Sequence, residues 1–251
     1  MNQERCVVFE LSGEFGHFRK VFTTTSPLTY AFPPPTALAG IIGAICGLPK
    51  QNNEYLKYFN PEKKYFAVEI LNPVRKIRLG INYNNTKGLD SGKLYRIIYA
   101  KHHEGRTQIP VEFLKKPRFR IYFSTENEEL LTRVSGLLRE NRTVYTVSLG
   151  LAYLLAKVKF VGEFRMEEKS GDGKTENINS VVPLSSIGEG GIELEKLSGY
   201  KLGKDSTVPF SITTERKIVR FGDIIYETNA KALPIKIKKF WEVNGKKIVF
   251  L

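Results

Sequence analysis

The apolar tract Ala37–Leu48 (ALAGIIGAICGL), which follows three consecutive prolines, is the feature that most constrains the fold. A helix that spans a membrane needs about 20 apolar residues, so this tract of about a dozen is too short to cross a bilayer, despite the GxxxG spacing of Gly43 and Gly47. We therefore expect a buried helix, with Thr36 as its N-cap and with glycines that allow close packing on a sheet.

Strand-like segments flank this helix. Cys6–Leu11 and Lys64–Leu71 are short apolar runs rich in β-branched and aromatic residues. Arg118–Ser124 alternates strictly: Phe119, Ile121 and Phe123 share one face, and Arg118, Arg120 and Tyr122 share the other. All three segments are predicted to be strands.

A second helix and a fourth strand complete a recognisable order. Glu126–Glu140 has a helical apolar stripe with acidic residues in its first turn, and Val144–Val147 is predicted to be a short closing strand. The order β-α-β-β-α-β is the ferredoxin-like pattern. The expected class is therefore α+β, with a ferredoxin-like (RRM-like) domain over residues 1–150.

The remaining residues, 151–251, are predicted to form a smaller β-rich region. Strand-like runs cover 157–164, 207–214, 218–228, 235–243 and 246–251. Asn244-Gly245, between the last two runs, is a strong hairpin signal. The polar segment Glu167–Asn179 is expected to be a mobile loop.

Positive charge is concentrated in one segment. The net charge is +13, and residues Arg75–Arg120 hold twelve Lys/Arg against three Asp/Glu, which contributes +9 of it. The flanks of its turn-rich centre, residues 76–83 and 93–100, are predicted to pair as a projecting basic hairpin, a thumb at about 75–107. A basic segment of this kind favours a polyanionic partner: nucleic acid first, an anionic membrane surface second.

Known nucleotide and metal motifs are absent from the sequence. Neither GxxxxGK[ST] nor GxGxxG occurs, and Cys6 and Cys46 lack zinc-ligand spacing, so we expect no cofactor and no metal. The N-terminus lacks the pattern of a signal peptide, which makes the cytoplasm the expected location. For Lys101-His102-His103, both metal-independent RNA cleavage and simple phosphate contact remain open.

The candidate RNA-binding residues are cations, hydroxyls and rings near the first helix and in the thumb. Free amides and the dipole at the helix start could hold phosphate, although the threonines could equally cap turns. Exposed rings beside cations could stack unpaired bases, although most could equally be core. The set comprises His17, Arg19, Lys20, Thr23, Thr24, Thr25, Tyr30, Thr36, Tyr83, Lys87, Lys93, Tyr95, Arg96, Lys101, His102 and Arg106.

Three ordered segments resemble the CRISPR-associated Cas-five family, in a form similar to its type I-B branch. They are GEFGHFRKVFTTTSPLTYAFPPPTALAGIIGAICGL, RTQIPVEFLKKPRFRIYF and TVYTVSLGLAYLLA. The resemblance implies a Cascade subunit in antiviral defence that caps the 5′ handle of CRISPR RNA. It also implies a backbone subunit and a large subunit as partners, target DNA only through the assembled complex, and no membrane.

The resemblance also bears on catalysis. One branch of the family, in type I-C systems, cuts precursor RNA with a Tyr, Lys and His set. Its tyrosine falls where this chain has Cys46, and its Lys-His pair falls in the second helix region, which has neither residue in that pattern. We therefore expect a non-catalytic protein, with a metal-independent endoribonuclease as the alternative.

Overall fold

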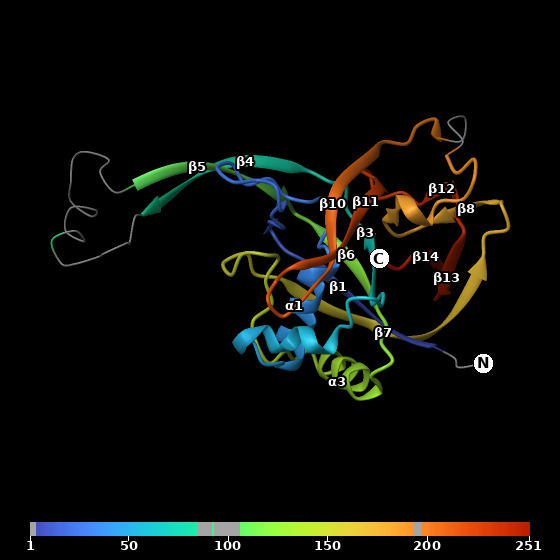
Figure 1. Cartoon of the computed structure of the whole chain (residues 1–251), viewed down its shortest axis with the longest axis horizontal. Helices are drawn as coiled ribbons and strands as arrows, with labels where there is room; N and C mark the ends of the chain where they lie inside the picture. The colour runs from blue at the N-terminus through green and yellow to red at the C-terminus, as the bar shows by residue number, and fades with distance from the viewer. Residues whose placement is uncertain (1–3, 85–91, 93–105, 193–196) are drawn as a thin grey trace.

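A central antiparallel sheet organises the chain in the computed structural model, which describes residues 4–84, 92, 106–192 and 197–251 (Figure 1). The fold is mixed α/β, rich in strands and with few helices. The six strands lie in the order β14-β13-β7-β1-β6-β3. Their bounds are β1 Glu4–Ser12, β3 Phe66–Ile70, β6 Arg118–Phe123, β7 Lys157–Ser170, β13 Lys239–Val243 and β14 Lys246–Ile248.

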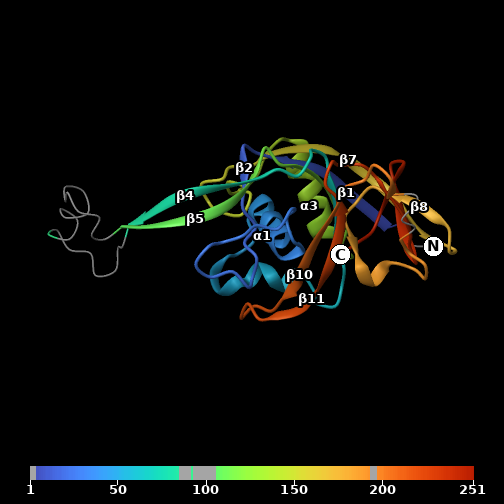
Figure 2. The ribbon, with the colours of Figure 1, turned by 90° about the horizontal axis from the view of Figure 1, so that it is seen from above.

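Two helices cover one face of this sheet (Figure 2). They are α1 (Pro35–Cys46) and α3 (Glu128–Arg139), and their buried side chains share one core with Phe9 of β1 and Ile121 of β6. Alternation along β1 and β6 sends every second side chain into this core. The predictions of both helices and of the first three strands are confirmed.

The start of α1 differs from the prediction. The helix begins at Pro35, its N-cap is Pro34, and no side chain caps it, so Thr36 is not the N-cap. Proline can occupy the first helical position because no intrahelical bond needs its missing N–H. The glycines also have another role: Gly43 faces the ring of Tyr55 rather than the sheet.

The strand that follows α3 lies later in the chain than predicted. Val144–Val147 forms no strand, because the Val144 and Tyr145 amides donate to the Ile45 and Ala44 carbonyls at the end of α1. The strand that pairs with β1 is β7. Residues on both sides of position 150 therefore share one sheet.

A separate three-stranded sheet projects from the body (Figure 1). It contains β2 (Phe15–Gly16), β4 (Lys76–Asn84) and β5 (Arg106–Lys115). The strand that pairs with β4 is β5, from Lys76 opposite Leu114 to Asn84 opposite Arg106. A hairpin is thus present at the predicted thumb, with β5 as the described partner of β4; residues 93–100, the predicted partner, lie outside the described residues.

The C-terminal region is β-rich, as predicted. β10 (Leu202–Ile212) pairs with β11 (Ile218–Glu227), which also pairs with β9 (Val182–Pro183), and Asn244-Gly245 joins β13 to β14 with positive φ at both residues. The prediction of a loop at 167–179 is wrong, because β7 continues to Ser170 and β8 (Thr175–Ile178) pairs with β12 (Leu233–Lys236). Short 3-10 helices, η1 (Gln51–Tyr58) and η2 (Leu184–Ser186), complete the described elements. Within the described part of the chain, no helix has the length and hydropathy of a membrane span.

Candidate nucleic-acid interface

The loop between β2 and α1 is fixed to the base of the thumb. The Thr29 amide donates to Glu112 Oε1 at 3.1 Å, and the Glu112 amide donates to the Pro27 carbonyl at 3.0 Å. Lys76 Nζ donates to the Thr29 carbonyl at 2.7 Å. The structure therefore brings together the two regions in which the sequence placed most candidate residues.

Lys20, however, forms an ion pair that stabilises the fold. Its Nζ lies 2.5 Å from Asp205 Oδ1 and 5.5 Å from the centroid of the Tyr30 ring. The Asp205 side chain is 1% exposed, and its other oxygen accepts from the Ala31 amide at 2.8 Å. A buried carboxylate requires this cation, so Lys20 is committed to joining the loop to β10.

Two other candidates are buried. Tyr30 is fully buried, and its hydroxyl donates to the Thr207 carbonyl at 2.7 Å. Burial raises the pKa of Tyr30 to about 12. The His17 side chain lies 2.7 Å from the Glu112 carbonyl, and burial lowers its pKa despite that contact. Neither ring is accessible to a base or a phosphate in this structure, so both are removed from the candidate surface.

The tip of the loop is accessible. Arg19 Nη2 donates to the carbonyls of Thr23, at 2.7 Å, and Thr24, at 3.3 Å. The Thr23 hydroxyl donates to the Lys20 carbonyl at 2.8 Å, which is the turn-capping role left open above. Thr24 and Thr25 are exposed. The Arg19 guanidinium thus orders the tip, while its Nη1 has no hydrogen bond to any of the residues that the structure describes.

Phe22 is the accessible ring of this loop. Its side chain is 59% exposed, beside Val21 at 48%. Lys20 Nζ lies 6.0 Å from the centroid of the Phe22 ring. An exposed ring near cations is suited to stacking an unpaired base. Phe22 is not among the residues predicted from the sequence, and no periodic pattern in the loop distinguishes it from Phe18, which is buried.

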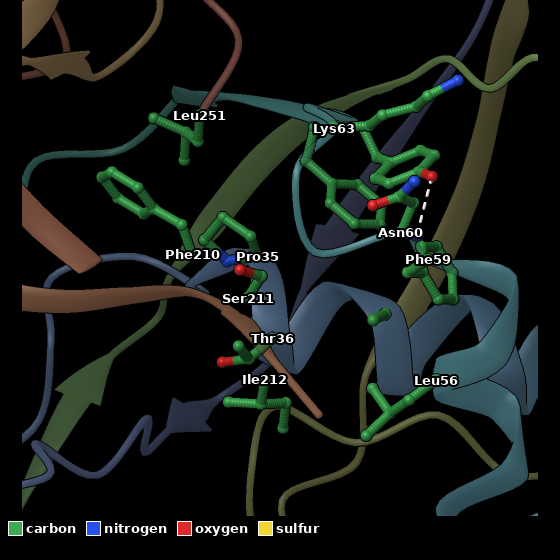
Figure 3. A pocket seen from close by; sticks show the side chains of 13 residues that line it. Pro35, Thr36, Leu56, Phe59, Asn60, Lys63, Phe210, Ser211, Ile212 and Leu251 are labelled. Carbon is green, nitrogen blue, oxygen red and sulfur yellow. Dashed lines mark hydrogen bonds between the residues drawn. The ribbon is translucent and has the colours of Figure 1, made fainter. Parts of the chain in front are cut away.

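The start of α1 lies against the C-terminal part of β10, where Pro35 and Thr36 face Ser211 and Ile212 (Figure 3). Thr36 lines a pocket there together with Ser211 and Ile212. Asp205, which holds Lys20, is six residues before Ser211, or roughly 15–20 Å along an extended strand. The Ala37 and Leu38 amides also donate to the Pro34 carbonyl. Thr36 and Lys20 therefore contact different parts of β10, and the Ala37 and Leu38 amides are already used within the helix.

The thumb has two different faces. Strand register places Arg78, Asn82 and Gln108 on the face that carries Lys76 and Glu112, next to the loop. All three are exposed, and Arg78 has no ion partner among the described residues. These residues extend the loop surface outward along the thumb. The alternation in KIRLGINYN was the signal that could have identified them.

Tyr83 lies on the opposite face of the thumb. It is 44% exposed and lies opposite Thr107, on the face that carries Leu79 and Val111. Burial and a hydrogen bond with Tyr83 raise the pKa of Tyr153. Tyr83 is therefore accessible, but the sheet separates it from the polar face of the thumb.

Several predicted site residues cannot be placed. Lys87, Lys93, Tyr95, Arg96, Lys101 and His102 lie outside the described residues. The backbone of Arg106 pairs with Asn84 at the outer end of the described hairpin.

A family model described as CRISPR-associated protein (Cas_Cas5) matches residues 6–185, which include the loop, the thumb and most of the central sheet. The chain belongs to the CRISPR-associated Cas-five family. No curated protein matches the sequence.

Solved structures share the fold of this Cas-five protein. A CRISPR protein from Archaeoglobus fulgidus is 13% identical with a TM-score of 0.51, over 98% of this chain and 99% of that one. A chain from a structure titled "CRISPR RNA-guided surveillance complex" is 12% identical with a TM-score of 0.52, over 90% and 91%. At these identities the likeness establishes the fold alone.

Cys46 ends α1 and is fully buried. Burial raises the pKa of its thiol to about 11, although the positive charge of Arg133 opposes the shift. A buried, protonated thiol supplies neither a nucleophile nor a general base at neutral pH.

Proposed function

We propose that this Cas-five protein is a non-catalytic RNA-binding subunit of a type I Cascade complex, and that it caps the 5′ handle of CRISPR RNA. The observation that carries the proposal is the attachment of the loop to the thumb through Thr29, Glu112 and Lys76. This attachment holds the loop that carries the exposed Phe22 ring against the thumb strands, one of which carries the Arg78 cation. A ring that stacks bases beside cations that hold phosphates suits a single strand.

The strand order supports a ferredoxin-like, RRM-like interpretation of the domain. Along the chain the order of elements is β1, α1, β3, β6, α3 and β7. In the sheet the four strands lie side by side in the order β7-β1-β6-β3. All neighbouring pairs are antiparallel. This arrangement corresponds to the split β-α-β pattern of that fold.

The proposal that the chain does not cut RNA is supported by two side chains. Cys46 occupies the position of the catalytic tyrosine of the type I-C branch and is buried. His17, also buried, faces a backbone carbonyl. Lys101, His102 and His103 lie outside the described residues, so the endoribonuclease alternative is decided by experiment.

The test is to incubate the purified protein with repeat RNA in EDTA and to measure binding and length of the RNA together. We expect RNA that is bound and intact, with tighter binding to RNA that carries the handle than to RNA with a scrambled handle. Cleavage in EDTA would establish the metal-independent endoribonuclease instead. Equal affinity for the two RNAs would overturn handle capping.

A further inference from the structure

The face of the central sheet opposite the helices is divided into two halves. Around Cys6 and Val8 it is apolar and packs against Ile248 and Phe250 of the C-terminal segment. Beyond Val8 the same face carries charged and polar side chains instead of apolar ones. Glu10 and Ser12 of β1 lie between Arg118 and Arg120 of β6 on one side and Lys157 and Lys159 of β7 on the other.

Both carboxylates on this half are used to hold arginines and a lysine. Glu10 accepts from Arg118 Nη2 at 2.7 Å and from Arg120 Nη2 at 2.8 Å. Glu69 accepts from Arg120 Nη1 at 3.1 Å and lies 3.3 Å from Lys246 Nζ. The two acids therefore fix the guanidinium groups in place. We call this the basic sheet face, and its cations are Arg118, Arg120, Lys157, Lys159 and Lys246.

The cations of the basic sheet face exceed its acids by five to two. Lys157 and Lys159 are exposed, and neither has an ion pair or a side-chain hydrogen bond among the described residues. Like charges on neighbouring positions of a sheet destabilise it. Core packing gives no reason to place them here, because the apolar half of the same face is the half that the C-terminal segment covers.

The spacing of the cations on the basic sheet face indicates which kind of ligand they would bind. Cations two residues apart on one strand are about 7 Å apart, and the cation rows of β6 and β7, which β1 separates, are about 10 Å apart. The two rows therefore flank β1 on both sides. The backbone of a single-stranded nucleic acid presents evenly spaced single negative charges. Among the described side chains of this half no exposed ring is present, since Tyr122 is buried and donates to Glu69. Contacts here would therefore reach phosphates and not bases.

We infer that the basic sheet face is a second nucleic-acid site, which binds the phosphodiester backbone of a single strand without regard to sequence. It shares no residue with the loop and thumb surface. Arg118 contributes an exposed guanidinium held by Glu10, and Lys157 and Lys159 contribute unpaired ammonium groups. Each of these contacts releases counterions when a phosphate binds.

The test compares two double variants of the full chain in binding to fluorescein-labelled oligouridylate across a range of salt concentrations. Lys157→Ala/Lys159→Ala removes two cations of the basic sheet face. Lys174→Ala/Lys201→Ala removes two exposed lysines elsewhere and has the same net charge. We expect the first variant to reduce the slope of log Kd against log salt by about 1.4, because each contact with a single strand contributes about 0.7. The second variant should leave the slope unchanged, and Lys157→Arg/Lys159→Arg should retain it.

Equal slopes for the first variant and the wild type would overturn the inference, and so would a reduction matched by the Lys174 and Lys201 control. Failure of the wild type to bind oligouridylate would also overturn it. Urea midpoints equal to that of the wild type show that the variants remain folded. The proposal of handle capping is tested by a different result: if it is wrong, the protein binds RNA with the handle and RNA with a scrambled handle equally well.

Discussion

Lys20 Nζ lies 2.5 Å from Asp205 Oδ1, and this ion pair joins the loop after β2 to the strand β10, far along the chain. Lys20→Ala should destabilise the fold by about 3–5 kcal/mol, because it leaves a buried carboxylate without its cation. The free energy of unfolding in urea measures the effect. Lys201→Ala, an exposed lysine beside the same strand, should change it by less than about 0.5 kcal/mol. Weaker RNA binding by Lys20→Ala with unchanged stability would contradict this role and assign the ammonium to RNA.

Phe22 should contribute to binding without contributing to stability. Phe22→Ala should weaken binding of handle RNA by about 1–3 kcal/mol, the range for loss of one stacked base. Its urea midpoint should match the wild type, since 59% of the side chain is exposed. Fluorescence anisotropy with labelled RNA measures the affinity. Phe221→Ala removes another ring that is 62% exposed, on β11, and should leave RNA affinity unchanged. Equal losses in both variants would show that Phe22 has no specific contact.

Arg78 gives a cleaner test of phosphate contact than Arg19. Arg19 hydrogen-bonds to the Thr23 and Thr24 carbonyls, so its removal also loosens the loop. Arg78 is exposed on β4 with no ion partner among the described residues. Arg78→Ala should reduce the slope of log Kd against log salt for handle RNA by about 0.7. Arg78→Lys should restore most of the slope, and an unchanged slope in Arg78→Ala would remove the thumb's polar face from the site.

The ion pairs of Glu10 predict that the protein becomes less stable in acid. Burial alone would raise its pKa, but hydrogen bonds from Arg118 and Arg120 outweigh burial and lower it. Because the pKa is lower in the folded state, the ionised Glu10 side chain stabilises the fold fully above the pKa of a glutamate in the unfolded chain, about 4.3. This stabilisation is lost as the pH falls through the pKa of Glu10 in the folded state. Glu10→Gln should therefore be less stable than the wild type at pH 7, by about 1–3 kcal/mol. Urea midpoints at pH 7 and pH 3 should show that the difference narrows in acid; a constant difference would contradict the ion-pair assignment.

Local pattern predicted most of the elements. The alternation in Arg118–Ser124 and the apolar stripe in Glu126–Glu140 correspond to β6 and α3. Each of these elements buries one face, so its apolar residues recur with the period of a strand or a helix. The same reasoning identified Asn244-Gly245 as a hairpin turn. The resemblance carried by three ordered segments identified the family, which the family model confirms.

Two of the errors have different causes. Val144–Val147 has a strand-like composition, but its amides complete the end of α1 instead. Thr36 follows prolines as an N-cap often does, yet Pro34 and Pro35 begin the helix without it. The partners of the Val144 and Tyr145 amides lie on a distant segment, whereas the Thr36 error is local, because Pro35 can occupy the first helical position without an N–H.

The sequence by itself determined the core strands, the two main helices, the concentration of charge in Arg75–Arg120 and the family. Only the tertiary structure decided which of the candidate side chains are accessible. Lys20 and Tyr30 have the chemistry of an RNA site, but Asp205 and Thr207 of β10 use them in the fold. Composition records which groups a chain possesses, whereas burial and pairing depend on residues brought together from almost 200 positions away, and these decide which groups remain free to bind.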